Sequence, residues 1–299
     1  GARDILRTEM GYPLHGHELS LEISPVQASA SWAIGWQKES FRGKQTLLEQ
    51  KQVGTKLKLR AILATDRGIP RKDMQVKDLT GKVILVTGTS KGIGSEIAAT
   101  LGRCGASVIA HYGKDAQGAQ DATKDIPDDR KLLISVDLSQ PDSYLELWQK
   151  ALAWKGRIDV LIPNAAIMPE AAITEPVEVW GKAWNDAIAV NATTPAFLIR
   201  EAVNHFLEIG GGNIIGISSW AAQRGSGNPK LGGYAASKPV IAALLKTVAR
   251  AYAKDGIYAY LISPGIVRTA MSEASAKSLG GEDAVTATLS MGEWVPPSE

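Results

Sequence analysis

The sequence has 299 residues, which could form one large domain or two smaller ones, and its 44% apolar content is typical of a protein with a buried core. Its 33 basic and 31 acidic side chains give a formal net charge of +2, which argues against nucleic acid or a membrane surface as a partner. The single cysteine, Cys104, excludes an intrachain disulfide, and no apolar run approaches the roughly 18 residues of a membrane-spanning helix. With no signal-peptide pattern, these features predict a cytoplasmic protein.

The first 75 residues differ in pattern from the rest of the chain. Their apolar residues are scattered, and only residues 56–63 alternate basic and apolar side chains as a half-exposed strand would. His15 and His17 have no cysteine or acidic cluster beside them, so we expect no metal site. We therefore expect two parts, with residues 1–75 forming a small partial α+β segment and residues 76–299 forming a separate domain.

From residue 80 onward, six short apolar runs alternate with stretches of helical periodicity. The runs lie at residues 83–87, 107–110, 132–136, 158–162, 213–217 and 257–262. The helical stretches include residues 92–104, 142–154, 178–207 and 234–254. Continuous apolar runs are typical of strands buried on both faces, and their alternation with helices favours right-handed crossovers. This pattern predicts an α/β domain with a Rossmann-like, doubly wound parallel sheet and helices on both faces.

The first apolar run leads directly into a glycine-rich turn before a helix, Thr87-Gly88-Thr89-Ser90-Lys91-Gly92-Ile93-Gly94. Glycines let the backbone turn tightly and approach a pyrophosphate, whose negative charge is favoured by the free N–H groups at a helix start. A glycine-rich turn alone is weak evidence, but its position between a buried strand and a helix predicts a dinucleotide site.

This turn resembles the cofactor fingerprint of short-chain dehydrogenases and reductases, T-G-x-x-x-G-I-G. Further landmarks of that family follow in order, so that the resemblance covers about three quarters of the chain. They are Val136-Asp137-Leu138, Pro163-Asn164-Ala165-Ala166 (two of four positions differ from the family's N-N-A-G), Asn191, Ser219, Tyr234-Ala-Ala-Ser-Lys238 and Pro264-Gly265. The resemblance implies a nicotinamide-dependent oxidoreductase with cofactor contacts at Gly88, Ser90, Lys91, Gly92, Ile93, Gly94, His111, Asp137, Leu138, Asn164, Ala165, Ala166, Tyr234, Lys238, Pro264, Gly265, Val267 and Thr269.

Four residues carry the expected chemistry. Tyr234 would act as acid/base, and Lys238, four residues later on the same helix, has a positive charge that would favour the phenolate. The resemblance further implies that Lys238 holds the nicotinamide ribose, that Ser219 binds the substrate oxygen, and that Asn191 holds a water linking Lys238 to solvent. Pro239 directly follows Lys238, and a proline inside a helix could kink it and shift the lysine.

The choice of cofactor depends on fewer residues. A ribose 2′-hydroxyl is usually read by an acidic side chain after the second strand, but no acid appears there until Asp115. Lys91 matches the position where NADP-preferring relatives have a basic residue. The sequence therefore favours NADP(H) over NAD(H), with a small-molecule carbonyl or alcohol as the substrate. Residues 220–231 and 268–292 are expected to line the substrate pocket.

Residues 1–75 resemble a different family, the glycine-cleavage aminomethyltransferases. The resemblance lies in residues 1–16, Ile23-Ser-Pro, Trp36, Phe41-Arg-Gly-Lys and residues 60–68. It implies part of a tetrahydrofolate pocket, with Glu9 as a candidate residue, although the catalytic acid of that family has no counterpart here. The alternative to an oxidoreductase is therefore a non-catalytic fusion or truncated product whose N-terminal fragment binds folate or a partner.

The other end of the sequence also departs from the dehydrogenase pattern. After Trp294, relatives usually continue through a helix and a seventh strand that supports the oligomer interface. We therefore expect an exposed sheet edge, and a homo-oligomer only if the scaffold is complete.

Overall fold

The computed structural model describes residues 22–28, 30–55, 78–278, 280–287, 289 and 292–298. By their contacts the residues divide into two compact units, one comprising residues 1–62 with 290–292 and the other residues 63–289 with 293–299. The expected boundary near residue 76 and the strand expected at residues 56–63 lie outside the described residues.

In the first unit, the described elements are a short 3₁₀ helix, η1 (Ser31–Ala33), and a helix, α2 (Lys44–Val53). The Trp36 indole N–H donates to the Ser31 carbonyl at 2.9 Å, and the Lys51 ammonium lies 5.0 Å from the centroid of the Trp36 ring. Glu9, His15 and His17 lie outside the described residues.

The second unit is built on six parallel strands in the order β3-β2-β1-β4-β5-β6. Their bounds are β1 (Val83–Thr87), β2 (Ser107–Tyr112), β3 (Lys131–Ser135), β4 (Val160–Ile162), β5 (Gly212–Ile217) and β6 (Ile257–Ile262). These confirm the six predicted strands and the Rossmann-like doubly wound sheet. The order reverses between β1 and β4, and ligands of such folds bind at the carboxyl ends of the strands beside this switch point.

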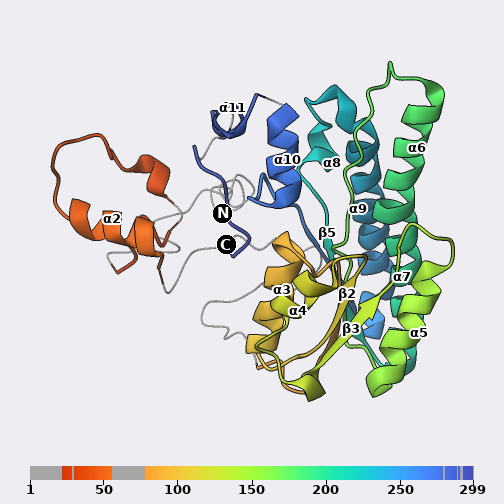
Figure 1. Ribbon diagram of the computed structural model, residues 1–299. Coiled ribbons are helices and arrows are strands. Elements are labelled where there is room, and N and C mark those ends of the chain that lie inside the picture. The colour runs from red at the N-terminus through yellow and green to blue at the C-terminus, as the bar shows by residue number, and fades with distance from the viewer. Residues whose placement is uncertain are drawn as a thin grey trace. The chain divides into compact units, whose positions relative to one another are not determined.

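Helices cover both faces of this sheet (Figure 1). The helices are α3 (Gly92–Arg103), α4 (Ala116–Ala122), α5 (Ser143–Lys155), α6 (Val177–Ile188), α7 (Thr194–Ile209), α8 (Ala221–Arg224), α9 (Gly232–Tyr252), α10 (Ala270–Ser278) and α11 (Glu282–Thr286). Short turns of other helix types are η2 (Asp128–Arg130), η3 (Ala189–Thr193), η4 (Pro229–Leu231) and η5 (Ala253–Asp255).

Strand β1 shows how the two faces acquire separate cores. Val83 and Leu85 belong to the large apolar cluster that includes side chains of α5, α7 and α9, whereas Ile84 and Val86 belong to a second cluster with Ala98 of α3. Successive side chains of a strand point to opposite faces, so a strand covered on both sides must be apolar throughout. All five β1 residues are buried.

One predicted helix is divided in the structure, and another continues through a proline. The single stretch expected at residues 178–207 is three elements, because a π-helical turn, η3, separates α6 from α7. The helix α9 continues through Pro239, which lies in its interior. No described helix is both long and apolar enough to cross a membrane.

The last described strand, β6, is at one edge of the sheet, as the sequence predicts. Tyr258 and Ile262 on this strand are 45% and 50% exposed. Beyond β6 the chain turns back, and an isolated parallel bridge joins Val267 to Val295, supported by a hydrogen bond from the Arg268 N–H to the Val295 carbonyl at 2.7 Å.

Candidate functional site

A cavity of about 1090 Å³ opens at the carboxyl ends of the strands. Ligand pockets usually measure about 300–1,000 Å³, so this cavity is slightly larger than the upper end of that range. Every predicted site residue lines it except Asn191. Residues 220–231 and 268–292 also contribute to its walls, as expected, through Trp220, Ala221, Ser226, Gly227, Asn228, Leu231, Thr269, Ala270, Met271, Ser272, Ser275, Ala276, Ala284 and Val285.

The glycine-rich turn forms one end of the cavity and is packed too closely for larger residues. A Cβ added to Gly94 would lie 2.0 Å from the Gly88 carbonyl oxygen and 2.5 Å from the Asn164 amide nitrogen. The Asn164 side chain donates to the Thr87 and Gly88 carbonyls at 2.9 and 3.2 Å, while its own N–H and that of Ala165 donate to the Thr87 hydroxyl. The loop after β4 therefore holds the turn after β1 in a fixed position.

His111 supports the same turn from β2. Its Nδ1 accepts from the Gly88 N–H at 3.2 Å, and its Nε2 lies 2.9 Å from the Val136 carbonyl, so the proton is assigned to Nε2. Burial lowers the pKa of His111, although the hydrogen bond to the Val136 carbonyl opposes this shift. The ring is therefore neutral and linked to the main chain at both nitrogens, although it also lines the cavity.

Next to the turn, the cavity wall carries two exposed lysines, Lys91 and Lys114. Neither has an ion pair among the described residues. Asp115, the first acid after β2, caps α4 by accepting from the Gly118 N–H at 2.9 Å, and its carbonyl accepts from the Ser90 hydroxyl at 2.7 Å. This end of the cavity therefore presents two cations and an acid that already has a structural partner.

The segment after β3 forms an adjacent wall. The Asp137 carboxylate accepts from the Ser139 hydroxyl and N–H at 2.7 and 3.0 Å, and these two bonds lower its pKa. The buried Leu138 is held through its carbonyl, which accepts from the Thr194 hydroxyl at 2.9 Å. This wall is therefore anchored both locally and to α7.

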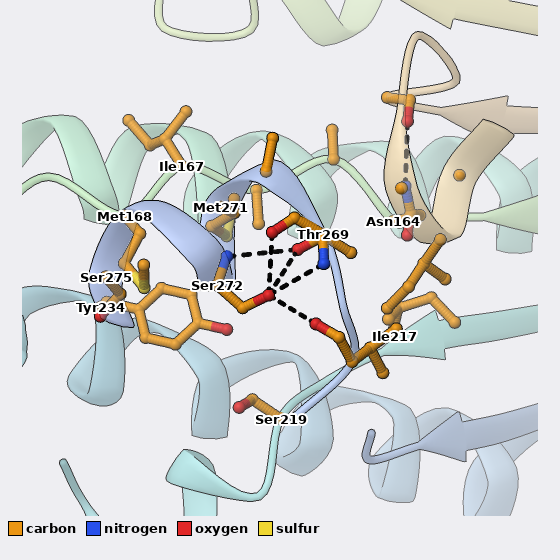
Figure 2. A pocket seen from close by; sticks show the side chains of 18 of the residues that line it. Asn164, Ile167, Met168, Ile217, Ser219, Tyr234, Thr269, Met271, Ser272 and Ser275 are labelled. Carbon is orange, nitrogen blue, oxygen red and sulfur yellow. Dashed lines mark hydrogen bonds between the residues drawn. The ribbon is translucent and has the colours of Figure 1, made fainter. Parts of the chain in front are cut away.

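Tyr234, Lys238 and Ser219 meet where β5 ends and α9 begins. The Lys238 ammonium donates to the Ile217 carbonyl at 3.0 Å and lies 5.7 Å from the centroid of the Tyr234 ring. Lysine has three N–H donors, so two remain for a ligand. Figure 2 shows the Tyr234 hydroxyl directed toward the interior of the site, with Ser219 nearby. Pro239 in α9 thus leaves Lys238 within reach of the tyrosine.

Burial is the largest influence on the pKa values of Tyr234 and Lys238. Desolvation lowers the pKa of Lys238 from 10.5 to about 8 and raises the pKa of Tyr234, while a hydrogen bond with Ser219 opposes the tyrosine shift. The sequence predicts that Lys238 shifts Tyr234 toward the phenolate. The protein's own groups, by contrast, keep the tyrosine protonated, which suits a proton donor.

Asn191 lies behind this group in the π-helical turn η3 and is 3% exposed. Its Nδ2 donates to the Ile167 carbonyl at 2.8 Å and to the Ser237 hydroxyl at 3.0 Å, and its Oδ1 accepts from the Ile167 N–H at 2.8 Å. π-Helical turns often mark functional sites. Here the side chain connects the loop after β4 to α9, which carries both Tyr234 and Lys238.

Sequence reasoning missed several residues of the cavity wall, including Ile167, Met168, Lys182, Asp186 and Trp294. Trp294 is buried against Ala276 and Val285, and its indole N–H donates to the Thr286 hydroxyl at 2.8 Å. Such contacts join distant parts of the chain, and the only signal in the sequence was the tryptophan itself.

Comparison with known proteins finds similarity to two different families. Over its N-terminal part the chain matches aminomethyltransferases, including one from Mycolicibacterium paratuberculosis at 42% identity over 128 residues, 42% of this chain and 33% of that protein. The chain spans about a third or less of the curated relatives it matches. This finding confirms the resemblance of the N-terminal residues to aminomethyltransferases.

The second unit is similar to solved oxidoreductase structures. A 3-oxoacyl (acyl-carrier-protein) reductase from Agrobacterium tumefaciens with NADP bound is 25% identical, with 76% of this chain and 88% of that chain covered and a TM-score of 0.67. An angucycline C-6 ketoreductase, LanV, with NADP bound is 27% identical, with 74% and 86% covered and a TM-score of 0.65. A family model described as short chain dehydrogenase matches residues 82–279. The chain therefore belongs to the short-chain dehydrogenase family.

Proposed function

We propose that this chain is an NADP(H)-dependent oxidoreductase that interconverts a carbonyl and an alcohol, with Tyr234 as the acid/base. The observation that carries the proposal is the position of Tyr234, Ser219 and Lys238 in one cavity with the glycine-rich turn. A dinucleotide at the turn is supported by its three glycines, Gly88, Gly92 and Gly94, which line the cavity and let main chain approach a pyrophosphate.

In this mechanism the bound cofactor supplies the hydride that reduces the carbonyl carbon. The substrate oxygen is held by the Ser219 hydroxyl and receives the proton of the Tyr234 hydroxyl. The Lys238 ammonium stabilises the phenolate left behind and uses its two remaining N–H groups to hold the cofactor ribose. Asn191 keeps α9 in register with the loop after β4, and it is also proposed to hold the water through which Lys238 exchanges protons with solvent.

The preference for NADP(H) is supported by Lys91 and Lys114, two cations on the cavity wall with no described ion-pair partner. The NADP bound in two similar structures agrees with this assignment. Lys91→Ala should weaken NADPH binding roughly tenfold and leave NADH binding unchanged, because only NADPH carries the 2′-phosphate. Dissociation constants for the two cofactors test this, and tighter NADH binding by the natural chain would overturn the preference.

The acid/base role of Tyr234 is tested with Tyr234→Phe. NADPH oxidation with a panel of ketones should fall about 10²–10⁴-fold, the usual value of positioned proton transfer, while the dissociation constant for NADPH changes little. Tyr258→Phe is a matched control, since Tyr258 lies on the exposed edge strand and not on the cavity wall. Full turnover by Tyr234→Phe would refute the assignment.

We further propose that residues 1–75 and 76–299 are separate structural parts. Limited proteolysis followed by mass spectrometry should yield a stable fragment that contains the whole six-stranded unit. First cleavages inside the six-stranded unit would contradict this division.

A further inference from the structure

The part of the cavity beyond Tyr234 has an apolar wall drawn from separate segments. Figure 2 shows Ile167, Met168 and Met271 there, and the large apolar side chains of the cavity as a whole also include Trp220, Leu231 and Trp294. In Figure 2, Ile167, Met168 and Met271 gather on one side of the Tyr234 ring, and Ser219 lies on the other. Thioether and aromatic side chains adapt well to flat rings, because sulfur–aromatic contacts are favourable and aromatic rings stack at offset or edge-to-face geometry.

The polar side chains in this part of the wall already have partners within the protein. The Ser272 hydroxyl donates to the Val267 and Thr269 carbonyls and is bonded to the Thr269 hydroxyl at 3.1 Å. Asn228 accepts from the Lys230 N–H at 3.0 Å, and the Ser226 hydroxyl accepts from the Asn228 N–H at 3.1 Å. Ser219 also accepts from the Ala221 N–H at 3.2 Å and is hydrogen-bonded with Tyr234, and these two hydroxyls are the groups that the proposed function assigns to the substrate oxygen.

The cations near this wall are also paired. Lys182 forms an ion pair with Asp186 at 2.6 Å across one turn of α6. Arg268 lies over the Trp294 ring at 5.2 Å and pairs with Glu273 at 3.7 Å and with Glu282. The remaining lysines of the described wall are Lys238, which belongs to the reacting group, and Lys91 and Lys114 beside the glycine-rich turn.

From this distribution we infer that the substrate is a neutral carbonyl compound with an apolar ring system, and that this wall rejects carboxylated or phosphorylated carbonyl compounds. The inference rests on the proposed function for the reaction itself. A carboxylate placed among these apolar side chains would lose its hydration, which is costly, and the nearby cations Lys182 and Arg268 already have carboxylate partners. A fused-ring ketone would place its oxygen at Ser219 and Tyr234 and its rings against Met168 and Met271.

The test uses a matched pair of ligands, α-tetralone and a tetralone that carries a ring carboxylate. Their binding to the full chain saturated with NADP⁺ is measured by calorimetry, which requires no turnover. We expect the neutral ketone to bind at least about tenfold more tightly than the carboxylate. Equal binding of the two, tighter binding of the carboxylate, or no detectable binding of the neutral ketone would overturn the inference.

A variant that introduces a positive charge into the apolar wall provides a second test. Met271→Lys should weaken binding of the neutral ketone and strengthen binding of the carboxylate, and Met168→Lys is a second variant if the first does not fold. Ile173→Lys is the control, because Ile173 is 79% exposed and lies outside the cavity wall, so the preference of the natural chain should persist. An unchanged preference in a folded Met271→Lys or Met168→Lys protein would count against the inference.

NADPH oxidation with the same ligands separates this inference from the proposed function. Tight binding of the neutral ketone without any NADPH oxidation would support the ligand class and refute the reaction. Oxidation of NADPH with both ketones at equal kcat/KM would support the reaction and refute the ligand class.

Discussion

Lys238 allows a direct test of how burial sets the charge of the candidate site. Desolvation lowers its pKa from 10.5 to about 8 in the folded protein, with the side chain 6% exposed and its ammonium bonded to the Ile217 carbonyl. Each pKa unit corresponds to about 1.36 kcal/mol, so the shift represents about 3 kcal/mol. Because the folded-state pKa lies below that of the unfolded chain, the unfolded chain binds more protons between pH 8 and 10.5. The free energy of unfolding should therefore rise with pH across this window.

The assay compares the natural chain with Lys238→Met by urea denaturation between pH 7 and 10.5. The variant lacks the titrating amine. The free energy of unfolding of the natural chain should therefore increase relative to that of the variant by about 3 kcal/mol across the window. Lys246→Met is the control, because Lys246 is exposed on the same helix, and its difference from the natural chain should stay flat. A flat difference for Lys238→Met would refute the reasoning that burial controls this lysine.

Two further predictions concern buried side chains that bond to main chain. Asn191→Ala should lower the free energy of unfolding by about 2–4 kcal/mol, because it leaves the Ile167 N–H and carbonyl without their partner and removes a donor to the Ser237 hydroxyl, which keeps its bond to the Tyr234 carbonyl; chemical denaturation measures this loss. His205 accepts from the buried Ile158 N–H at 3.1 Å, and burial lowers its pKa, so its contribution to stability should be present above about pH 6.5 and be lost as the pH falls. The unfolding free energy of the natural chain should therefore fall more steeply below pH 6.5 than that of His205→Gln.

For each of these two predictions, one specific result would contradict the reasoning. Asn185→Ala is the control for Asn191, because Asn185 is exposed on α6, and an equal loss for both variants would show that the buried bonds do not carry the effect. The group at His205 includes Glu208, Arg157 and Asp159, whose charges also act on it. Parallel pH profiles for the natural chain and His205→Gln would exclude the histidine as the source.

The strands and the cofactor-binding turn could be predicted because both depend on local sequence. Each strand of a sheet covered on two faces must be continuously apolar, so runs such as Val83–Thr87 are evident without knowledge of their neighbours. The glycine-rich turn was recognised because it lies between a buried strand and a helix and matches a family fingerprint, and the structure adds that Gly94 has no room for a Cβ. The same reasoning did not find the π-helical turn η3, which divides the stretch expected as one helix. The short helix α4 was also missed.

The substrate wall could not be predicted because it depends on contacts between distant residues. Met168 and Trp294 are 126 positions apart in the sequence and line one cavity only because the strands bring their loops together. The role of Asn191 was likewise hidden, since its partners Ile167 and Ser237 are 24 and 46 residues away. Local sequence patterns identified the candidate catalytic and cofactor-binding residues, whereas the contacts that hold these residues in place could be obtained only from the fold.

One kind of contact holds the site in place. In each case a side chain of one segment forms a hydrogen bond with the main chain of another segment. Asn164 holds the turn after β1, His111 holds the same turn from β2, and Asn191 holds the loop after β4. Lys238 holds the end of β5 from α9. The main-chain partners Thr87 and Ile217 belong to β1 and β5, and Gly88 directly follows β1, so these bonds transfer the rigidity of the sheet to groups that face the cavity. Substitutions at these four side chains should therefore disturb cofactor binding and stability together, whereas substitutions of Met168 or Met271 should act mainly on the choice of ligand.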